Sequence, residues 1–127
     1  MPKSLAFTTL TVTFAVSGAA LAAEPASMPP TAKNGMFADA KGMTLYTFDK
    51  DMPGKSACNG QCATNWPPLL VADGAKASGN WSIITRDNGL KQWAYKGKPL
   101  YGWVKDTKPG DTTGDGFLNG AWHVARP

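Results

Sequence analysis

Two cysteines and one histidine are the residues of this sequence best suited to redox or metal chemistry. Cys58 and Cys62 are its only cysteines, and they form a Cys-x-x-x-Cys pair in a loop rich in Gly and Asn. In an exported chain such a pair favours a disulfide. We therefore expect the two Cα atoms to lie roughly 4.4–6.8 Å apart. The bridge would pin the loop, with a smaller effect than a ring of ~15 residues, which is worth ~3 kcal/mol.

Copper binding is the alternative interpretation of the same residues. Cys58, Cys62 and His123, the single histidine, form a soft ligand set of the kind found in Sco-type copper chaperones. Thioether ligands would come from three methionines: Met36, Met43 and Met52. Those chaperones are thioredoxin-like, whereas nothing in this sequence alternates strand with helix. A periplasmic copper-binding or thiol redox protein is therefore our second hypothesis.

Other residue types give little support for catalysis. Glu24 is the sole glutamate, and the sequence shows no general acid and base on one element and no nucleophile beside a base. The spacing of Asp106, Asp111 and Asp115 is not that of the common calcium loop, so we interpret these residues as a solvated polar turn. We expect no enzyme and no cofactor.

The charge pattern argues against nucleic-acid binding. The formal net charge is +4, but the positive residues are mostly scattered lysines, and Arg86 and Arg126 are the only arginines. A nucleic-acid-binding protein is expected to cluster Lys and Arg along one face, with aromatic residues between them. No nucleic-acid partner is therefore expected. The partner is expected to be an envelope ligand or protein, whose identity the sequence does not give.

A tandem repeat organises the chain that positions these residues. The segment 45–51, Leu-Tyr-Thr-Phe-Asp-Lys-Asp, returns at 100–106 as Leu-Tyr-Gly-Trp-Val-Lys-Asp, and a tryptophan closes each copy, at Trp66 and Trp122. The shared motif consists of Tyr46, Phe48 and Asp51 in the first copy and of Tyr101, Trp103 and Asp106 in the second. Repeats of this kind complete each other's core. We expect the two copies to superpose about a pseudo-two-fold axis.

The motif side chains are expected to build this core. Tyr46 and Phe48 point to one face of a strand, because side chains alternate with period two, and aromatic rings fill a small core efficiently. The alternative is an exposed aromatic platform for a flat ligand. Asp51 and Asp106 follow the strands, where they would accept hydrogen bonds from the amides of the next turn.

Short strands joined by frequent turns predict an all-β fold. Residues 81–86 and 90–95 read as a hairpin around Asn88-Gly89, a dipeptide that suits a tight turn. Further strands are expected at 36–39, 44–48, 65–71, 99–104 and 121–125, with no room for helices. The two repeats, about 35–71 and 88–126, would each form a three-stranded unit. Their assembly into a small antiparallel sandwich or into a curled sheet or barrel stays open.

The N-terminal region predicts export. Residues 1–23 combine a basic start, an apolar stretch and small residues suited to cleavage after Ala22 or Ala23. Residues 24–32 are Pro-rich and are expected to form a flexible arm, followed by a single domain at 33–127. We expect a periplasmic or secreted protein with no transmembrane segment after signal cleavage.

Taken together, the motifs resemble a bacterial family of predicted secreted lipoproteins. The motifs are 45–51, the Cys-Asn-Gly-Gln-Cys-Ala run at 58–63, the Trp-Pro-Pro-Leu run at 66–69, and Tyr101-x-Trp103-x-x-Asp106. This family, the secreted repeat of unknown function, is described by a Tyr-x-aromatic-x-x-Asp motif. The resemblance implies an exported envelope protein with no established activity, for which we expect binding or scaffolding. The chain has no lipobox cysteine, which favours a soluble periplasmic location over a tethered one.

Overall fold

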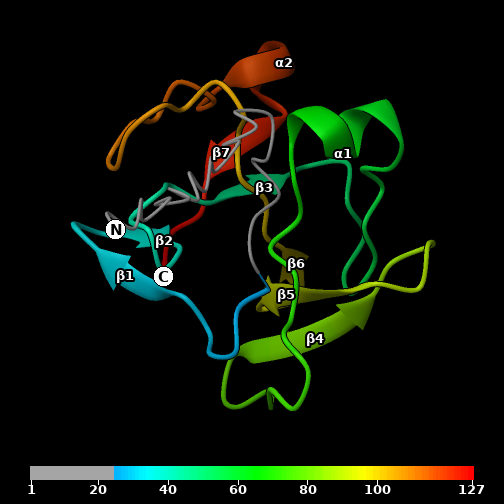
Figure 1. Cartoon of the computed structure of the whole chain (residues 1–127). Coiled ribbons are helices and arrows are strands. Elements are labelled where there is room, and N and C mark those ends of the chain that lie inside the picture. Colours follow the sequence, from blue (N-terminus) through cyan, green and yellow to red (C-terminus); the bar gives the residue numbers. More distant parts are fainter. Residues whose placement is uncertain (1–24) are drawn as a thin grey trace, which may run out of the picture.

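A computed structural model describes residues 25–127 as a set of short strands joined by long loops (Figure 1). The expected signal peptide lies outside the described residues. Within 25–127 the strands are β1 (Thr31–Lys33), β2 (Met36–Ala38), β3 (Tyr46–Phe48), β4 (Trp81–Thr85), β5 (Lys91–Tyr95), β6 (Lys98–Pro99) and β7 (Trp122–Val124). Two short helical segments, α1 (Gln61–Asn65) and α2 (Phe117–Gly120), lie close together at one end.

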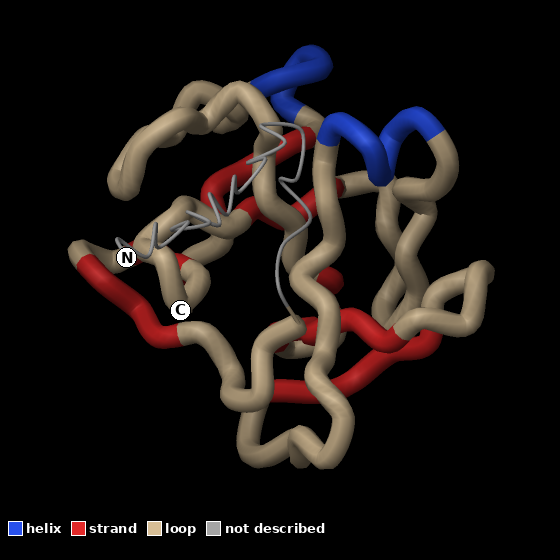
Figure 2. The backbone as a smooth tube through the Cα atoms, viewed as in Figure 1, coloured by secondary structure: helices blue, strands red, loops and turns tan. Residues whose placement is uncertain are grey.

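The strands form small antiparallel sheets, as Figure 2 shows by the short red segments among tan loops. β1 pairs with β2, β3 pairs with β7, and β5 lies between β4 and β6. The predicted all-β class is confirmed, and no closed barrel is found among residues 25–127. The sequence is expected to leave no room for helices, and within residues 25–127 only α1 and α2, of five and four residues, depart from this expectation.

The predicted hairpin is formed by β4 and β5. Ile83 pairs with Trp93 at the centre of this ladder. Gly89 takes a φ of 85°, which glycine adopts without steric cost, and the Asn88 side chain accepts a 3.0 Å hydrogen bond from the Leu90 amide. The turn chemistry of the sequence therefore fixes this local structure.

The segment expected to be a flexible arm is partly held in place. The Ala26 amide donates to the Leu70 carbonyl at 2.8 Å, and the Ala26 carbonyl accepts from the Ala72 amide at 2.9 Å and from the Trp93 indole at 3.0 Å. β1 begins at Thr31, before the expected start of the domain at residue 33. These bonds use backbone groups of the arm, which the arm's composition does not reveal.

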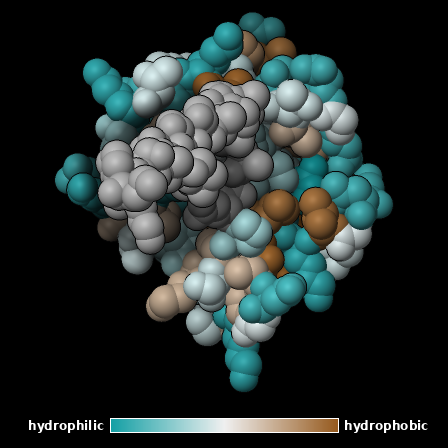
Figure 3. All heavy atoms as spheres, viewed as in Figure 1, coloured by the Kyte–Doolittle hydropathy of each residue, from teal (hydrophilic) through white to brown (hydrophobic). Residues whose placement is uncertain are grey.

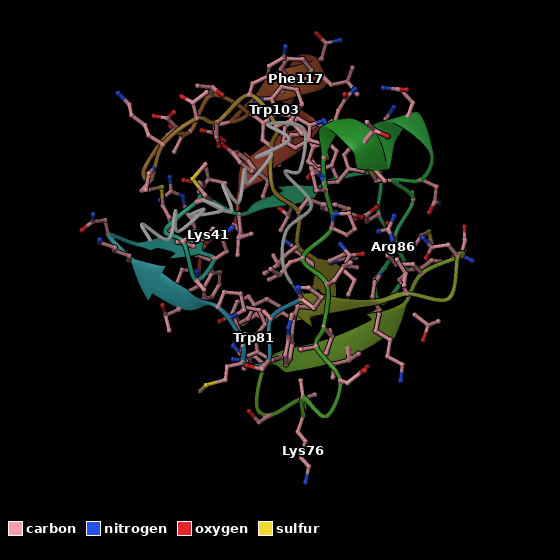
Figure 4. All side chains as sticks on the ribbon, viewed as in Figure 1. Lys41, Lys76, Trp81, Arg86, Trp103 and Phe117 are labelled. Carbon is pink, nitrogen blue, oxygen red and sulfur yellow. A yellow bond between two sulfur atoms is a disulfide. The ribbon has the colours of Figure 1, made fainter. Side chains whose placement is uncertain are left out.

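Two buried clusters lie on opposite sides of the segments that contain Tyr46 and Tyr101. The motif cluster consists of Tyr46, Cys58, Trp66, Tyr101, Trp103, Trp122 and Val124. The hairpin cluster consists of Phe37, Leu45, Leu69, Trp93, Leu100 and Ala125. Neighbouring residues such as Leu45 and Tyr46 enter different clusters because successive side chains point to opposite faces. Figure 4 shows the two sides: Trp103 lies near α2, and Trp81, which packs against the hairpin cluster, lies near β4.

The end of the second repeat completes the first repeat. Three backbone amides form a closed ring of hydrogen bonds: Leu45 donates to Phe37 at 3.0 Å, Phe37 to Ala125 at 2.9 Å, and Ala125 to Leu45 at 2.8 Å. Phe37 and Leu45 belong to the first copy, whereas Ala125 follows β7 at the end of the second. One copy therefore lacks the third member of its own ring.

The end of the first repeat completes the second in the same way. Leu100 donates to Trp93 at 3.0 Å, Trp93 to Leu69 at 2.9 Å, and Leu69 to Leu100 at 2.9 Å. Leu69 lies three positions after Trp66, as Ala125 lies three positions after Trp122. The expectation that each repeat forms its own three-stranded unit is therefore wrong, because the third segment of each unit comes from the other copy.

Candidate functional site

The two copies of the motif meet at Tyr46 and Tyr101. The Tyr46 amide donates to the Tyr101 carbonyl at 2.8 Å, and the Tyr101 amide donates back to the Tyr46 carbonyl at 3.0 Å. Such a reciprocal pair in an antiparallel bridge has a local two-fold axis between its residues. The expected pseudo-two-fold relation of the repeats therefore passes through the motif itself.

The polar side chains of the motif cross from one repeat to the other. The Tyr46 hydroxyl donates to the Asp106 carboxylate at 2.6 Å, and the Tyr101 hydroxyl donates to the Asp51 carboxylate at 2.6 Å. Tyrosine and aspartate within one motif are not partners. The motif therefore joins the two copies.

Each motif carboxylate also binds the turn that follows its own strand. Asp51 Oδ1 accepts from the Ala57 amide at 2.7 Å, and Asp106 Oδ1 accepts from the Thr113 amide at 2.9 Å. This geometry agrees with the expected turn-capping role. Asp106 is buried. Both carboxylates are therefore engaged by two parts of the structure at once.

The aromatic residues form a stack that runs across the two-fold axis. Adjacent ring centroids are 4.2 Å apart for Phe48 and Trp122, 3.8 Å for Trp122 and Trp66, and 3.9 Å for Trp66 and Trp103. Phe117 of α2 lies 4.8 Å from Trp103 at one end of the stack (Figure 4). Trp103 is only 9% exposed, whereas Phe48 is half-buried. The motif aromatics thus pack as core rather than as an open platform.

Burial sets the ionisation of the motif hydroxyls. Desolvation, and next to it the hydrogen bond to Asp106, raises the pKa of Tyr46 well above its ordinary value. Desolvation and the bond to Asp51 raise the pKa of Tyr101 in the same way. Desolvation also raises the pKa of Asp51, although its bond from Tyr101 opposes this shift. Both tyrosines therefore stay neutral donors at physiological pH.

A buried arginine that the sequence analysis assigned no structural role holds the cysteine loop. Arg86 is 4% exposed, and its guanidinium donates to Cys58 O at 2.6 Å, Gln92 Oε1 at 2.7 Å and Ser56 Oγ at 3.0 Å. Ser56 Oγ lies 2.6 Å from the Tyr101 hydroxyl, so the network continues into the motif. The signal was present in the sequence, because Arg86 shares an inward face with the buried Ile84 by alternation.

The two cysteines form the expected disulfide. Their Cα atoms are 5.2 Å apart, within the predicted range, and Cys62 lies in α1. Cys58 is fully buried in the motif cluster. The bridge therefore ties α1 to the core beside Arg86.

The structure does not bring His123 to the cysteines. Trp122 and Val124 point into the cluster that contains Cys58, so His123 between them points to the opposite face of β7. Both cysteine sulfurs are bonded to each other. Among residues 25–127 no group of three or more His, Cys, Asp or Glu side chains is arranged to hold a metal ion. A copper site would require reduction of the bridge and a different ligand set.

The opposite face of β3 and β7 is polar and hollowed. We call Thr47, Asp49 and His123 the polar face: Thr47 lies opposite His123 in the ladder, and His123 Nε2 lies 2.7 Å from Asp49 Oδ2. A cavity of about 330 Å³ opens beside these three residues, and Lys98 and Arg126 also line it. A second cavity, of about 190 Å³, adjoins at Thr47, Asp49 and Lys98. Sequence reasoning missed this site, because its members come from distant segments.

The fold and the crossed contacts define a class of protein: two tandem β repeats that complete one another. A family model described as a secreted repeat of unknown function matches residues 30–70 and 82–126, and the chain belongs to this family. The matches begin earlier than the expected repeats at 35 and 88, since they take in β1 and most of β4. No curated protein and no solved structure matches the chain significantly. Within residues 25–127, no helix has the length and apolar character that crossing a membrane requires.

Proposed function

We propose that this protein works outside the cytoplasm, in the periplasm or after secretion, as a binding or scaffolding module rather than as an enzyme. Its family is described as secreted. The observation that carries the proposal is the structural role of the motif. The Tyr46 hydroxyl donates its hydrogen bond to Asp106, and the Tyr101 hydroxyl donates to Asp51, across the two-fold axis. Groups held in this way stabilise a scaffold.

Ligand contacts on such a scaffold would come from its surface. Hydrophilic residues cover most of the described surface visible in Figure 3. The polar face combines exposed hydrogen-bonding groups with the larger of its two cavities, because the His123 and Asp49 side chains are 49% and 61% exposed. Concave sites with a few convergent polar groups are where ligands usually bind. The polar face is therefore the binding surface in this proposal.

The experiment is affinity capture with the exported chain immobilised and a solubilised envelope fraction as the source. We expect one component to be retained reproducibly and to be released by free protein. A matched column carrying the double variant Asp49→Ala, His123→Ala should retain much less of this component. The loss would report on binding and not on folding, because these exposed side chains do not support the core. Equal retention on both columns, or retention on neither, contradicts the proposal.

A further inference from the structure

The polar face is present on one side of the pseudo-two-fold axis only. His123 follows Trp122 as Pro67 follows Trp66, and Thr47 and Asp49 have their own counterparts at the same offsets from the motif tyrosines. These counterparts are Gly102, Val104 and Pro67. The equivalent contact is kept without polar side chains, since the Gly102 amide donates to the Pro67 carbonyl at 2.7 Å. The scaffold therefore does not need Thr47, Asp49 or His123 for its own stability.

Two cationic side chains beside this face have donor groups left for a ligand. Lys98 and Arg126 line the 330 Å³ cavity, and both are exposed. Within residues 25–127 the Lys98 ammonium makes no hydrogen bond or ion pair, and Arg126 Nη1 donates a long bond of 3.4 Å to the Gly35 carbonyl. An ammonium and a guanidinium at one cavity favour a carboxylate or a similar anion.

The carboxylate of Asp49 makes a simple anion a poor match. It would repel a ligand that carried negative charge alone, whereas it accepts hydrogen bonds readily from hydroxyl groups. The hydroxyl of Thr47 and the imidazole of His123 add groups that donate and accept. The matching ligand therefore carries a negative group for the cations and hydroxyl groups for the polar face.

We propose that this cavity binds a carboxylated saccharide, with the carboxylate at Lys98 and Arg126 and the sugar hydroxyls at Thr47, Asp49 and His123. The volume of about 330 Å³ lies at the lower end of ligand pockets, which run from roughly 300 to 1,000 Å³, and suits one or two sugar rings. The inference rests on the proposed binding function and names its ligand class.

Calorimetric titration of the full exported chain with digalacturonic acid tests the proposal. We expect saturable binding that weakens as salt is added, because the contact is partly ionic. Lys98→Ala and Arg126→Ala should each weaken binding by about tenfold, which corresponds to ~1.4 kcal/mol. The matched control is Lys76→Ala, an exposed lysine on the far loop beyond β4 (Figure 4), which should leave binding unchanged.

Two further probes separate a saccharide site from a plain anion site. The neutral disaccharide of galactose should bind at least about tenfold more weakly, since it lacks the ionic contact. Tricarballylate, a tricarboxylate without hydroxyl or N–H groups, should also bind more weakly, because it offers no hydrogen-bond donor to Asp49. Asp49→Ala should weaken the binding of digalacturonic acid. At a plain anion site, the same substitution would instead strengthen the binding of every acidic probe.

Several results would overturn the proposal. Preference for tricarballylate, equal binding of the neutral sugar, or an effect of Lys76→Ala as large as that of Lys98→Ala would each do so. If digalacturonic acid fails to bind while an envelope component is still retained through the polar face, the ligand class is wrong and the binding function stands. If both experiments fail, the proposed function falls as well.

Discussion

The hydroxyl of Tyr46 donates a 2.6 Å hydrogen bond to the carboxylate of Asp106, a residue of the other repeat. The same relation, at the same distance, joins Tyr101 to Asp51. Within each motif the tyrosine and the aspartate lie close in sequence, yet they serve different halves of the molecule. The motif is therefore a device for joining two copies, and its residues should be coupled in pairs across the repeats.

The crossed pairs should show this coupling in stability. Tyr46→Phe leaves the buried Asp106 carboxylate without its tyrosine donor, so we expect a loss of about 1.5–3 kcal/mol in the free energy of unfolding. In a double-mutant cycle, Tyr46→Phe should couple to Asp106→Asn and not to Asp51→Asn. Urea denaturation of the single and double variants measures both the stability loss and the coupling free energy. Tyr95→Phe is the matched control, since within residues 25–127 the Tyr95 hydroxyl makes no hydrogen bond; coupling of Tyr46 to Asp51 would contradict the crossed arrangement.

High pH should destabilise the protein through the same tyrosines. The folded pKa of Tyr46 and of Tyr101 lies above the unfolded value, so the folded state keeps protons that the unfolded state loses. Their contribution is complete below the unfolded pKa of about 10 and falls as pH rises through the folded pKa, by about 1.4 kcal/mol per tyrosine for each pH unit. Denaturation series on either side of about pH 10 measure this slope. In Tyr46→Phe the slope should be shallower, and an unchanged slope would rule out this cause.

Gly114 should tolerate no side chain. A Cβ at this position would lie 2.7 Å from Cη2 of Trp66 and 3.0 Å from Cδ1 of Trp103, and both indoles are fixed in the stack. Gly114→Ala is expected to cost about 1–3 kcal/mol, because overpacking displaces side chains. Gly102→Ala is the control, since its Cβ would meet only the Pro67 carbonyl at 3.9 Å. Thermal melting of the two variants compares them, and equal melting temperatures would show that the stack can move.

Separate halves of the chain should fold only together. Each half lacks the third member of its hydrogen-bonded ring, so we expect residues 25–73 and 77–127, expressed as two polypeptides, to be unstructured alone. Mixed, they should form one complex with the near-ultraviolet circular dichroism of the intact chain. A half that shows native tryptophan signals as a monomer would contradict the exchange of segments between repeats.

Thiol titration separates the disulfide from a copper site. The exported protein, denatured without reductant, should show no free thiols, and reduction should release both Cys58 and Cys62. Reduction should cost less than ~3 kcal/mol, because the closed ring is much shorter than ~15 residues. The double variant Cys58→Ser with Cys62→Ser should not respond to reductant. Two free thiols that copper protects would favour the alternative function.

Local features of this fold were readable from the sequence. The Asn88-Gly89 turn, the alternation of β4 and β5 and the spacing of the cysteines each act through neighbouring residues, and each has the predicted structure. The period-two alternation also predicts that Tyr46 lies in the core, and it indicates that the charged side chain of Arg86 points inward.

The choice of partner was not readable. Residues 65–71 are expected to form a strand, but the structure has only isolated bridges there. Their sequence pattern is the same whether the segment pairs within its own repeat or with the other, because alternation specifies a face and not a neighbour. The polar face could not be predicted from the sequence either, because Asp49, Lys98 and His123 lie far apart in sequence. Ala26 is held through its backbone, and a backbone group has no sequence signature.

The exchange of terminal segments has an evolutionary consequence. Two identical repeats that complete each other form a symmetric pair, in which every substitution is made twice and its cost is doubled. Once the copies are fused in one gene, each side can vary alone while the shared axis through Tyr46 and Tyr101 persists. Here the first copy has the Cys58–Cys62 disulfide, and the second has a glycine, Gly114, packed closely against Trp66 and Trp103. Fusion therefore converts a symmetric assembly into a chain whose halves diverge independently.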